Sequence, residues 1–114
     1  MKEIKAYVRP GPLADIIDRL EAQGARDLAV TRVDALGALA DAEDDRLRRG
    51  HKYRDQYSDM AKVEIVCADA EVERFVRVLK EASANGARSD GRIFVLDVEA
   101  AISLGDDGEM KEAL

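Results

Sequence analysis

The chain repeats one pattern of secondary structure, strand–helix–strand, in each of its halves. Residues 2–9 (KEIKAYVR) alternate polar and apolar side chains, as a half-buried strand does, and residues 28–36 form a second candidate strand. In the second half, residues 60–67 and 92–98 are the candidate strands. The apolar stripe of a helix lies between the strands of each half, formed by Leu13, Ile16, Ile17 and Leu20 and then by Val72, Phe75, Val76 and Leu79.

Turn and cap residues bound these predicted elements. Pro10 ends the first strand, and Pro12 suits the first turn of the helix that follows. Gly24 ends that helix, and Asp69 is the expected N-cap of the second helix.

This order of elements strongly restricts the fold. Two right-handed strand–helix–strand units of this length pack as one antiparallel sheet with both helices on one face. We therefore expect one α+β domain over residues 1–114, a ferredoxin-like βαββαβ sandwich with a long loop between its halves. The other face of the sheet needs cover, and a trimer with inward-facing sheets is one solution that the pattern leaves open.

Composition excludes several classes of function. A net charge of −6 argues against generic nucleic-acid binding. The absence of a long apolar run argues against insertion in a membrane, and residues 1–25 lack the layout of a secretory signal. The single cysteine, Cys67, fits a reducing cytoplasm and is expected to be a small buried side chain. With one histidine, His51, a metal site and a catalytic pair are both unexpected, so we predict no enzyme.

The loop over residues 85–95 (NGARSDGRIFV) is the strongest candidate for ligand binding. Glycines allow close approach to the backbone, and exposed amides flanked by guanidinium groups suit phosphate oxygens. The alternative is an ordinary helix-to-strand turn with Gly86 as its C-cap. These residues alone do not decide between the two.

Two further segments lack a regular pattern. Residues 37–59 carry acidic residues first and basic residues afterwards, so they form either a solvated helix or hairpin, or a mobile arm that docks a partner through tyrosines such as Tyr53. Residues 100–114 form a C-terminal tail that either folds over a neighbouring subunit or stays disordered.

Four sequence features resemble the PII family of trimeric signal-transduction proteins. They are the opening MKEIKAYVRP with its helix, the passage from Val33 to Gly37 into a long loop, RGHKY at residues 49–53, and SDGRIFVLDV at residues 89–98. The last is the most specific. Together they cover about residues 1–99 in the family's order.

The resemblance implies a homotrimer whose inter-subunit clefts bind an adenine nucleotide. It also implies a mobile T-loop at residues 37–59, with Arg49 and Tyr53 as partner-binding or modifiable residues, that engages a membrane transporter or a metabolic enzyme. Arg92 stands where the family has a phosphate-binding lysine. The residues expected to line the cleft are Gly37, Ala38, Val66, Gly86, Ala87, Arg88, Ser89, Asp90, Gly91 and Arg92.

Departures from the family pattern narrow the expected ligand. Met60 replaces a lysine that pairs with 2-oxoglutarate, and the positions of a glutamine, a loop cation and two distal arginines hold Leu39, Ala87, Ser103 and Gly105. Because each lost charged contact removes on the order of 1.5–3 kcal/mol, we expect AMP, ADP or a cyclic nucleotide rather than Mg-ATP.

The resemblance leaves the pathway open. The family's branches linked to carboxysomes or bicarbonate transport are the nearest analogy, with bicarbonate as a further candidate ligand. The alternatives are a ligand-independent interaction module that uses residues 37–59 and a conventional nitrogen-sensing PII protein.

Overall fold

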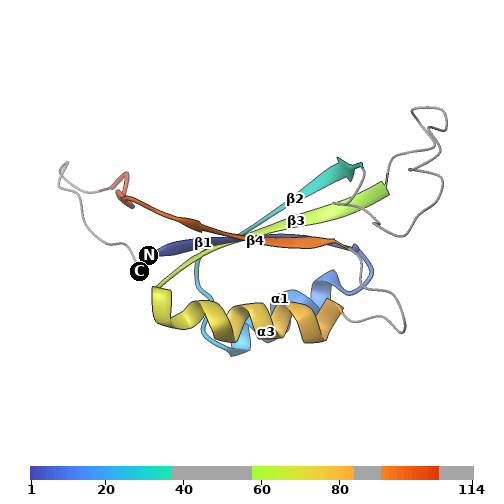
Figure 1. Cartoon of the computed structure of the whole chain (residues 1–114), viewed down its shortest axis with the longest axis horizontal. Helices are drawn as coiled ribbons and strands as arrows, with labels where there is room; N and C mark the ends of the chain where they lie inside the picture. The colour runs from blue at the N-terminus through green and yellow to red at the C-terminus, as the bar shows by residue number, and fades with distance from the viewer. Residues whose placement is uncertain (37–57, 84–90, 106–114) are drawn as a thin grey trace.

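The computed structural model describes residues 1–36, 58–83 and 91–105. Within them lies a sheet of four strands in the order β2-β3-β1-β4, and every neighbouring pair is antiparallel. Helices α1 and α3 lie side by side beneath one face of this sheet (Figure 1). The predicted ferredoxin-like α+β arrangement is confirmed.

The strands begin and end close to the positions that the sequence predicts. Their bounds are β1 Lys2–Val8, β2 Leu28–Ala35, β3 Ser58–Cys67 and β4 Arg92–Asp97. Strand β3 pairs with β1 as far as Ala61 and continues with β2 to Ser58, so β2 and β3 extend together past β1. Strands β2 and β4 are the two edges of the sheet.

Helix α1 spans Leu13–Ala22 and ends as the sequence indicates. Gly24 has φ of +97°, and the amide of Ala25 donates to the carbonyl of Leu20 across 2.9 Å. A left-handed glycine with such a bond is a common helix terminus because it satisfies carbonyls that the helix leaves free.

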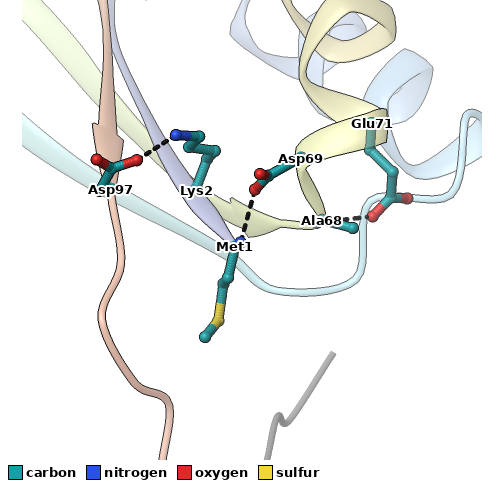
Figure 2. A network of polar contacts seen from close by, with 6 residues as sticks. All are labelled: Met1, Lys2, Ala68, Asp69, Glu71 and Asp97. Atoms are coloured by element: carbon teal, nitrogen blue, oxygen red, sulfur yellow. Dashed lines mark hydrogen bonds and ion pairs between the residues drawn. The ribbon is translucent and has the colours of Figure 1, made fainter.

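The second helix, α3 (Val72–Ser83), begins differently from the prediction. Asp69 is not its N-cap but the first residue of a short 3-10 helix, η3 (Asp69–Glu71). The Glu71 carboxylate accepts a hydrogen bond from the amide N–H of Ala68 at 3.1 Å. The side chain of the last residue of η3 thus caps the free amide of the residue that precedes η3. Asp69 is thereby left to accept a bond from the amino group of Met1 at 2.6 Å (Figure 2).

The core fills the space between the sheet and the helices. Alternate residues of β1 and β3, such as Ile4 and Ile65, point towards Ile16 and Leu20 of α1 and Phe75 of α3, and all of these are fully or almost fully buried. Cys67 belongs to this core with 2% of its surface exposed, which confirms the prediction of a small buried side chain. Among the described residues, no helix covers the opposite, outer face of the sheet (Figure 1).

Candidate functional site

Most residues of the predicted cleft lie outside the described part of the chain. Val66, Gly91 and Arg92 lie within it. Outside it lie Gly37, Ala38, Gly86, Ala87, Arg88, Ser89 and Asp90, together with Arg49 and Tyr53 of the predicted T-loop. The described residues Val66, Gly91 and Arg92 belong to or adjoin the strands that border the predicted cleft.

Gly91 leads into the edge strand β4, and its backbone lies against β1. It has φ of +94°, and a Cβ at this position would overlap the carbonyl group of Tyr7. The close approach that the sequence assigned to a ligand is therefore made here by the backbone of a neighbouring strand. Gly91 sets the path by which the predicted phosphate loop joins the sheet.

Arg92 is the first residue of β4 and is exposed. It lies opposite Tyr7 on β1, and Phe94, two residues further along, lies on the same face of the sheet. The rings of Tyr7 and Phe94 pack edge to face with 6.2 Å between centroids. This contact gives the end of β4 a fixed aromatic neighbour, and the guanidinium of Arg92 remains accessible to a ligand.

A pocket of about 410 Å³ lies beside Val66, at the opposite end of the sheet. It is formed by the start of β2 and the segment before it, the end of β3 and the start of β1. Its lining residues are Glu3, Arg26, Asp27, Leu28, Ala29, Glu64 and Val66. Its volume lies in the range of small-molecule sites.

The charges of this pocket suit one part of a nucleotide better than another. Glu3, Asp27 and Glu64 contribute carboxylates, and Arg26 contributes one guanidinium group. Carboxylates accept hydrogen bonds from amino groups and repel phosphates. The excess of carboxylates in the pocket therefore suits a base or ribose better than a phosphate.

One protomer does not bring these two ends together. Val66 lies opposite Glu3 on β1, and Arg92 lies opposite Tyr7 on the other side of the same strand. At about 3.3 Å per residue, four residues of β1 separate the two positions by roughly 13 Å along the strand. Val66 on β3 and Arg92 on β4 thus lie diagonally across β1 on the outer face.

Most residues that line this pocket were not predicted from the sequence. Only Val66 was expected there, and the carboxylates of Glu3 and Glu64 and the segment before β2 were missed. The alternation of strand residues could have predicted Glu64, because it precedes Val66 by two residues and so lies on the same face of β3. The contribution of Arg26 and Asp27 depends on how β2 is placed beside β3 and has no such signal.

Met60 lies on the outer face at the same end of the sheet as Gly91 and Arg92. It is fully buried and packs with Ala35 against Tyr7 and Val33. The family resemblance predicts a lysine at this position. Met60 stands there instead and belongs to an apolar cluster that joins β2, β3 and β1. The arrangement gives no charged group at residue 60 for a dicarboxylate ligand.

A polar network holds the end of the sheet next to the Val66 pocket (Figure 2). Besides the contact between Met1 and Asp69, Lys2 of β1 pairs with Asp97 of β4. The hydrogen bond from the Met1 amino group lowers the pKa of Asp69. These contacts join β1, β4 and the turn after β3, so they stabilise the framework on which Glu3 and Val66 lie.

Searches of known proteins give the family. A family model described as "Nitrogen regulatory protein P-II" matches residues 1–107. The chain belongs to the P-II family. It is 32% identical to Nitrogen regulatory protein P-II of Pasteurella multocida over the full length of both chains, and 35% identical to the protein of that name from Cereibacter sphaeroides over 96% of this chain and 97% of the relative. Nitrogen regulatory protein GlnK2 of Haloferax mediterranei is 35% identical over 91% of this chain and 83% of its own length.

Membership carries several general properties of P-II proteins. They are non-enzymatic signal-transduction regulators that act on partner proteins, and as a family they bind adenine nucleotides as regulatory ligands. Within residues 1–36, 58–83 and 91–105, no helix has the length and apolarity to span a bilayer. The same residues contain no three or more His, Cys, Asp or Glu side chains that are placed to hold one metal ion.

Proposed function

We propose that this P-II protein senses AMP, ADP or a cyclic adenine nucleotide in clefts between the subunits of a homotrimer. The observation that carries the proposal is the diagonal placement of Arg92 and the Val66 pocket on one open sheet face. A protomer supplies a cationic corner and a base-sized corner that do not meet. Two adjacent copies can bring the Arg92 corner of one chain to the Val66 pocket of the next.

Exposed apolar residues on β4 support the trimer. Phe94, Val95 and Leu96 keep 43%, 47% and 42% of their surfaces exposed, on an edge strand with no neighbour beyond it among the described residues. A run of large apolar side chains on a free edge favours association, because covering it removes apolar area from water. Copies that cover this edge would also complete the cleft.

The preference for a smaller nucleotide over Mg-ATP rests on charge. Arg92, which lies in the described part of the chain, is one candidate for contact with phosphate. Arg88 of the glycine loop is a second candidate, predicted from the sequence. The positions at which the family supplies two more arginines, Ser103 and Gly105, carry no charge. One or two guanidinium groups suffice for a mono- or diphosphate, whereas a triphosphate would keep uncompensated charge.

The nucleotide would act through the T-loop on a transporter or metabolic enzyme in the cytoplasm, with Arg49 and Tyr53 among the contacts. Inorganic-carbon metabolism, with bicarbonate as a further ligand, is one candidate pathway. Nitrogen regulation is the second, and the printed names of the relatives favour it. The buried Met60 speaks against 2-oxoglutarate, the co-ligand that a conventional nitrogen sensor requires.

Calorimetry on the assembled protein tests the proposal. Titrations with AMP, ADP, cyclic AMP and Mg-ATP, each with and without 2-oxoglutarate or bicarbonate, should give saturable heat for at least one of the first three. We expect weaker binding of Mg-ATP and no effect of 2-oxoglutarate. A folded trimer that binds none of the nucleotides would leave the ligand-independent interaction module as the better description.

A dependence of Mg-ATP binding on 2-oxoglutarate would instead identify a conventional nitrogen sensor. It would show that other residues replace the missing lysine at position 60.

A further inference from the structure

Four charged residues occupy the centre of the outer sheet face. Glu3 and Lys5 lie on β1, and Lys62 and Glu64 lie on β3; we call them the charge quartet. The Lys5 Nζ lies 3.8 Å from Glu3 Oε1, and the Lys62 Nζ lies 3.5 Å from Glu64 Oε1. The strand register also places Lys5 directly opposite Glu64. Charges of opposite sign therefore follow one another along each strand, and the one pair that faces across the strands, Lys5 and Glu64, also joins opposite charges.

The quartet is unusually enclosed for surface ion pairs. The exposed fractions of its side chains are 26% for Glu3, 29% for Lys5, 25% for Lys62 and 27% for Glu64. By contrast, the ion pair between Asp15 and Arg19 on α1 is 56% and 50% exposed. Because solvent screens enclosed charges less, the sign of any further charge placed over the quartet matters more than over an ordinary surface pair.

Apolar surface adjoins the quartet on the β4 side. The register places Phe94 opposite Lys5 and Leu96 opposite Glu3. These side chains border a pocket of about 360 Å³, which is lined by Lys5, Tyr7, Phe94, Val95 and Leu96. A partner that covers the apolar residues of β4 therefore also comes over the edge of the quartet and removes water from it.

We propose that the charge quartet selects which chains can assemble on this face, and that the chain it accepts is a second copy of itself. This inference rests on the homotrimer of the proposed function and adds a basis for its specificity. The quartet has equal positive and negative charge in an alternating order, so another copy can offer each charge an opposite one. A chain with a different order of charges would place like charges together in a poorly hydrated contact, which is costly.

A charge-inverted chain tests this selection directly. The variant E3K/K5E/K62E/E64K keeps each pair within its strand and the opposition of residues 5 and 64, but reverses every sign. Unfolded parent and variant chains, distinguished by isotope labelling, are mixed, refolded together and analysed by native mass spectrometry. We expect each chain to assemble with its own kind at low salt, and mixed trimers to increase towards binomial proportions as salt screens the quartet.

A matched control inverts an ion pair on the opposite layer. The variant D15R/R19D reverses the exposed pair on α1 and should mix with the parent chain in binomial proportions at every salt concentration. Binomial mixing of the quartet-inverted chain at low salt would overturn the inference and leave the trimer intact. A parent chain that stays monomeric would remove the proposed assembly, and the inference with it.

A neutral variant covers the case in which the inverted chain does not fold, as judged by circular dichroism. In E3Q/K5Q/K62Q/E64Q the quartet has no charge, but every position keeps a polar side chain. The parent trimer should dissociate more readily as salt increases, and the neutral trimer should lose this dependence. An equal salt dependence in both proteins would contradict the role of the quartet.

Discussion

The backbone of Tyr7 leaves no room for a side chain on Gly91. A Cβ at Gly91 would lie 1.9 Å from the Tyr7 carbonyl oxygen, and the backbone has φ of +94°. Gly91 joins the predicted phosphate loop to the sheet, so the position of Arg92 depends on this contact. Position 91 requires glycine because of packing inside the protomer, whether or not a ligand is bound.

Replacing Gly91 should therefore destabilise the folded protein. In Gly91→Ala the positive φ alone costs on the order of 1–3 kcal/mol, and relief of the overlap requires a shift of β1 or β4. Urea unfolding followed by circular dichroism measures the loss. The control is Gly105→Ala, because a Cβ there meets nothing within 4 Å. Equal stability of the two variants would show that the contact between Gly91 and Tyr7 is not made.

Arg92 is expected to contribute to nucleotide affinity without contributing to the fold. Arg92→Ala should weaken binding of AMP or ADP by on the order of 1.5–3 kcal/mol, because a charge-assisted bond to phosphate is lost. Calorimetry gives the affinity. Arg77→Ala, which removes an exposed guanidinium from α3, should have no effect. Unchanged affinity in Arg92→Ala would exclude Arg92 as a phosphate ligand.

The pocket beside Val66 can be filled from the exposed edge strand β2. In Ala29→Phe the added ring should occupy the space proposed for the base and reduce nucleotide affinity about tenfold or more, which corresponds to ~1.4 kcal/mol. Thr31→Phe is the matched control, since Thr31 is also exposed and lies on the same face two residues along, outside the lining of the pocket. Equal effects of the two substitutions would remove the pocket from the site.

Phe94 should be needed for assembly. Phe94→Lys places a charge on the apolar surface of β4, where 43% of the Phe94 surface is exposed in the protomer. We expect trimer formation to weaken by about 2 kcal/mol or more, as for a central interface aromatic. Sedimentation over a range of concentrations measures this. Ala14→Lys on the exposed side of α1 should leave assembly unchanged, and a trimer of undiminished stability in Phe94→Lys would place the interface elsewhere.

Cys67 should react slowly with thiol reagents in the folded protein. Burial raises the pKa of its thiol, with Glu71 as a further cause, so less thiolate is present at a given pH than in the unfolded chain. Stability should decline once the pH rises above the unfolded thiol's pKa, because the unfolded state then releases its proton first. Ellman's reagent, with and without denaturant, measures the reactivity. A native rate equal to the denatured rate would contradict the burial of Cys67.

The outline of the fold could be predicted from the sequence because it depends on local periodicity. The alternation in residues 2–9 and the apolar stripes of both helices appear as β1, α1 and α3 in the structure. The prediction for Asp69 was wrong because the helical turn begins at Asp69 itself, with Ala68 as its N-cap residue, and the Asp69 carboxylate accepts a bond from the Met1 amino group. Where a turn begins, and which distant group a carboxylate meets, depends on tertiary geometry that residue types alone do not express.

The sequence by itself determined the order of elements, the family and the positive charge at Arg92. Only the tertiary structure decided that Val66 and Arg92 lie diagonally across β1, that a pocket with three carboxylates adjoins Val66, and that Glu3, Lys5, Lys62 and Glu64 form one cluster. The reason is that helix and strand periodicity arise from neighbours along the chain. Strand register, in contrast, brings together residues far apart in sequence and is fixed by the packing of the whole sheet.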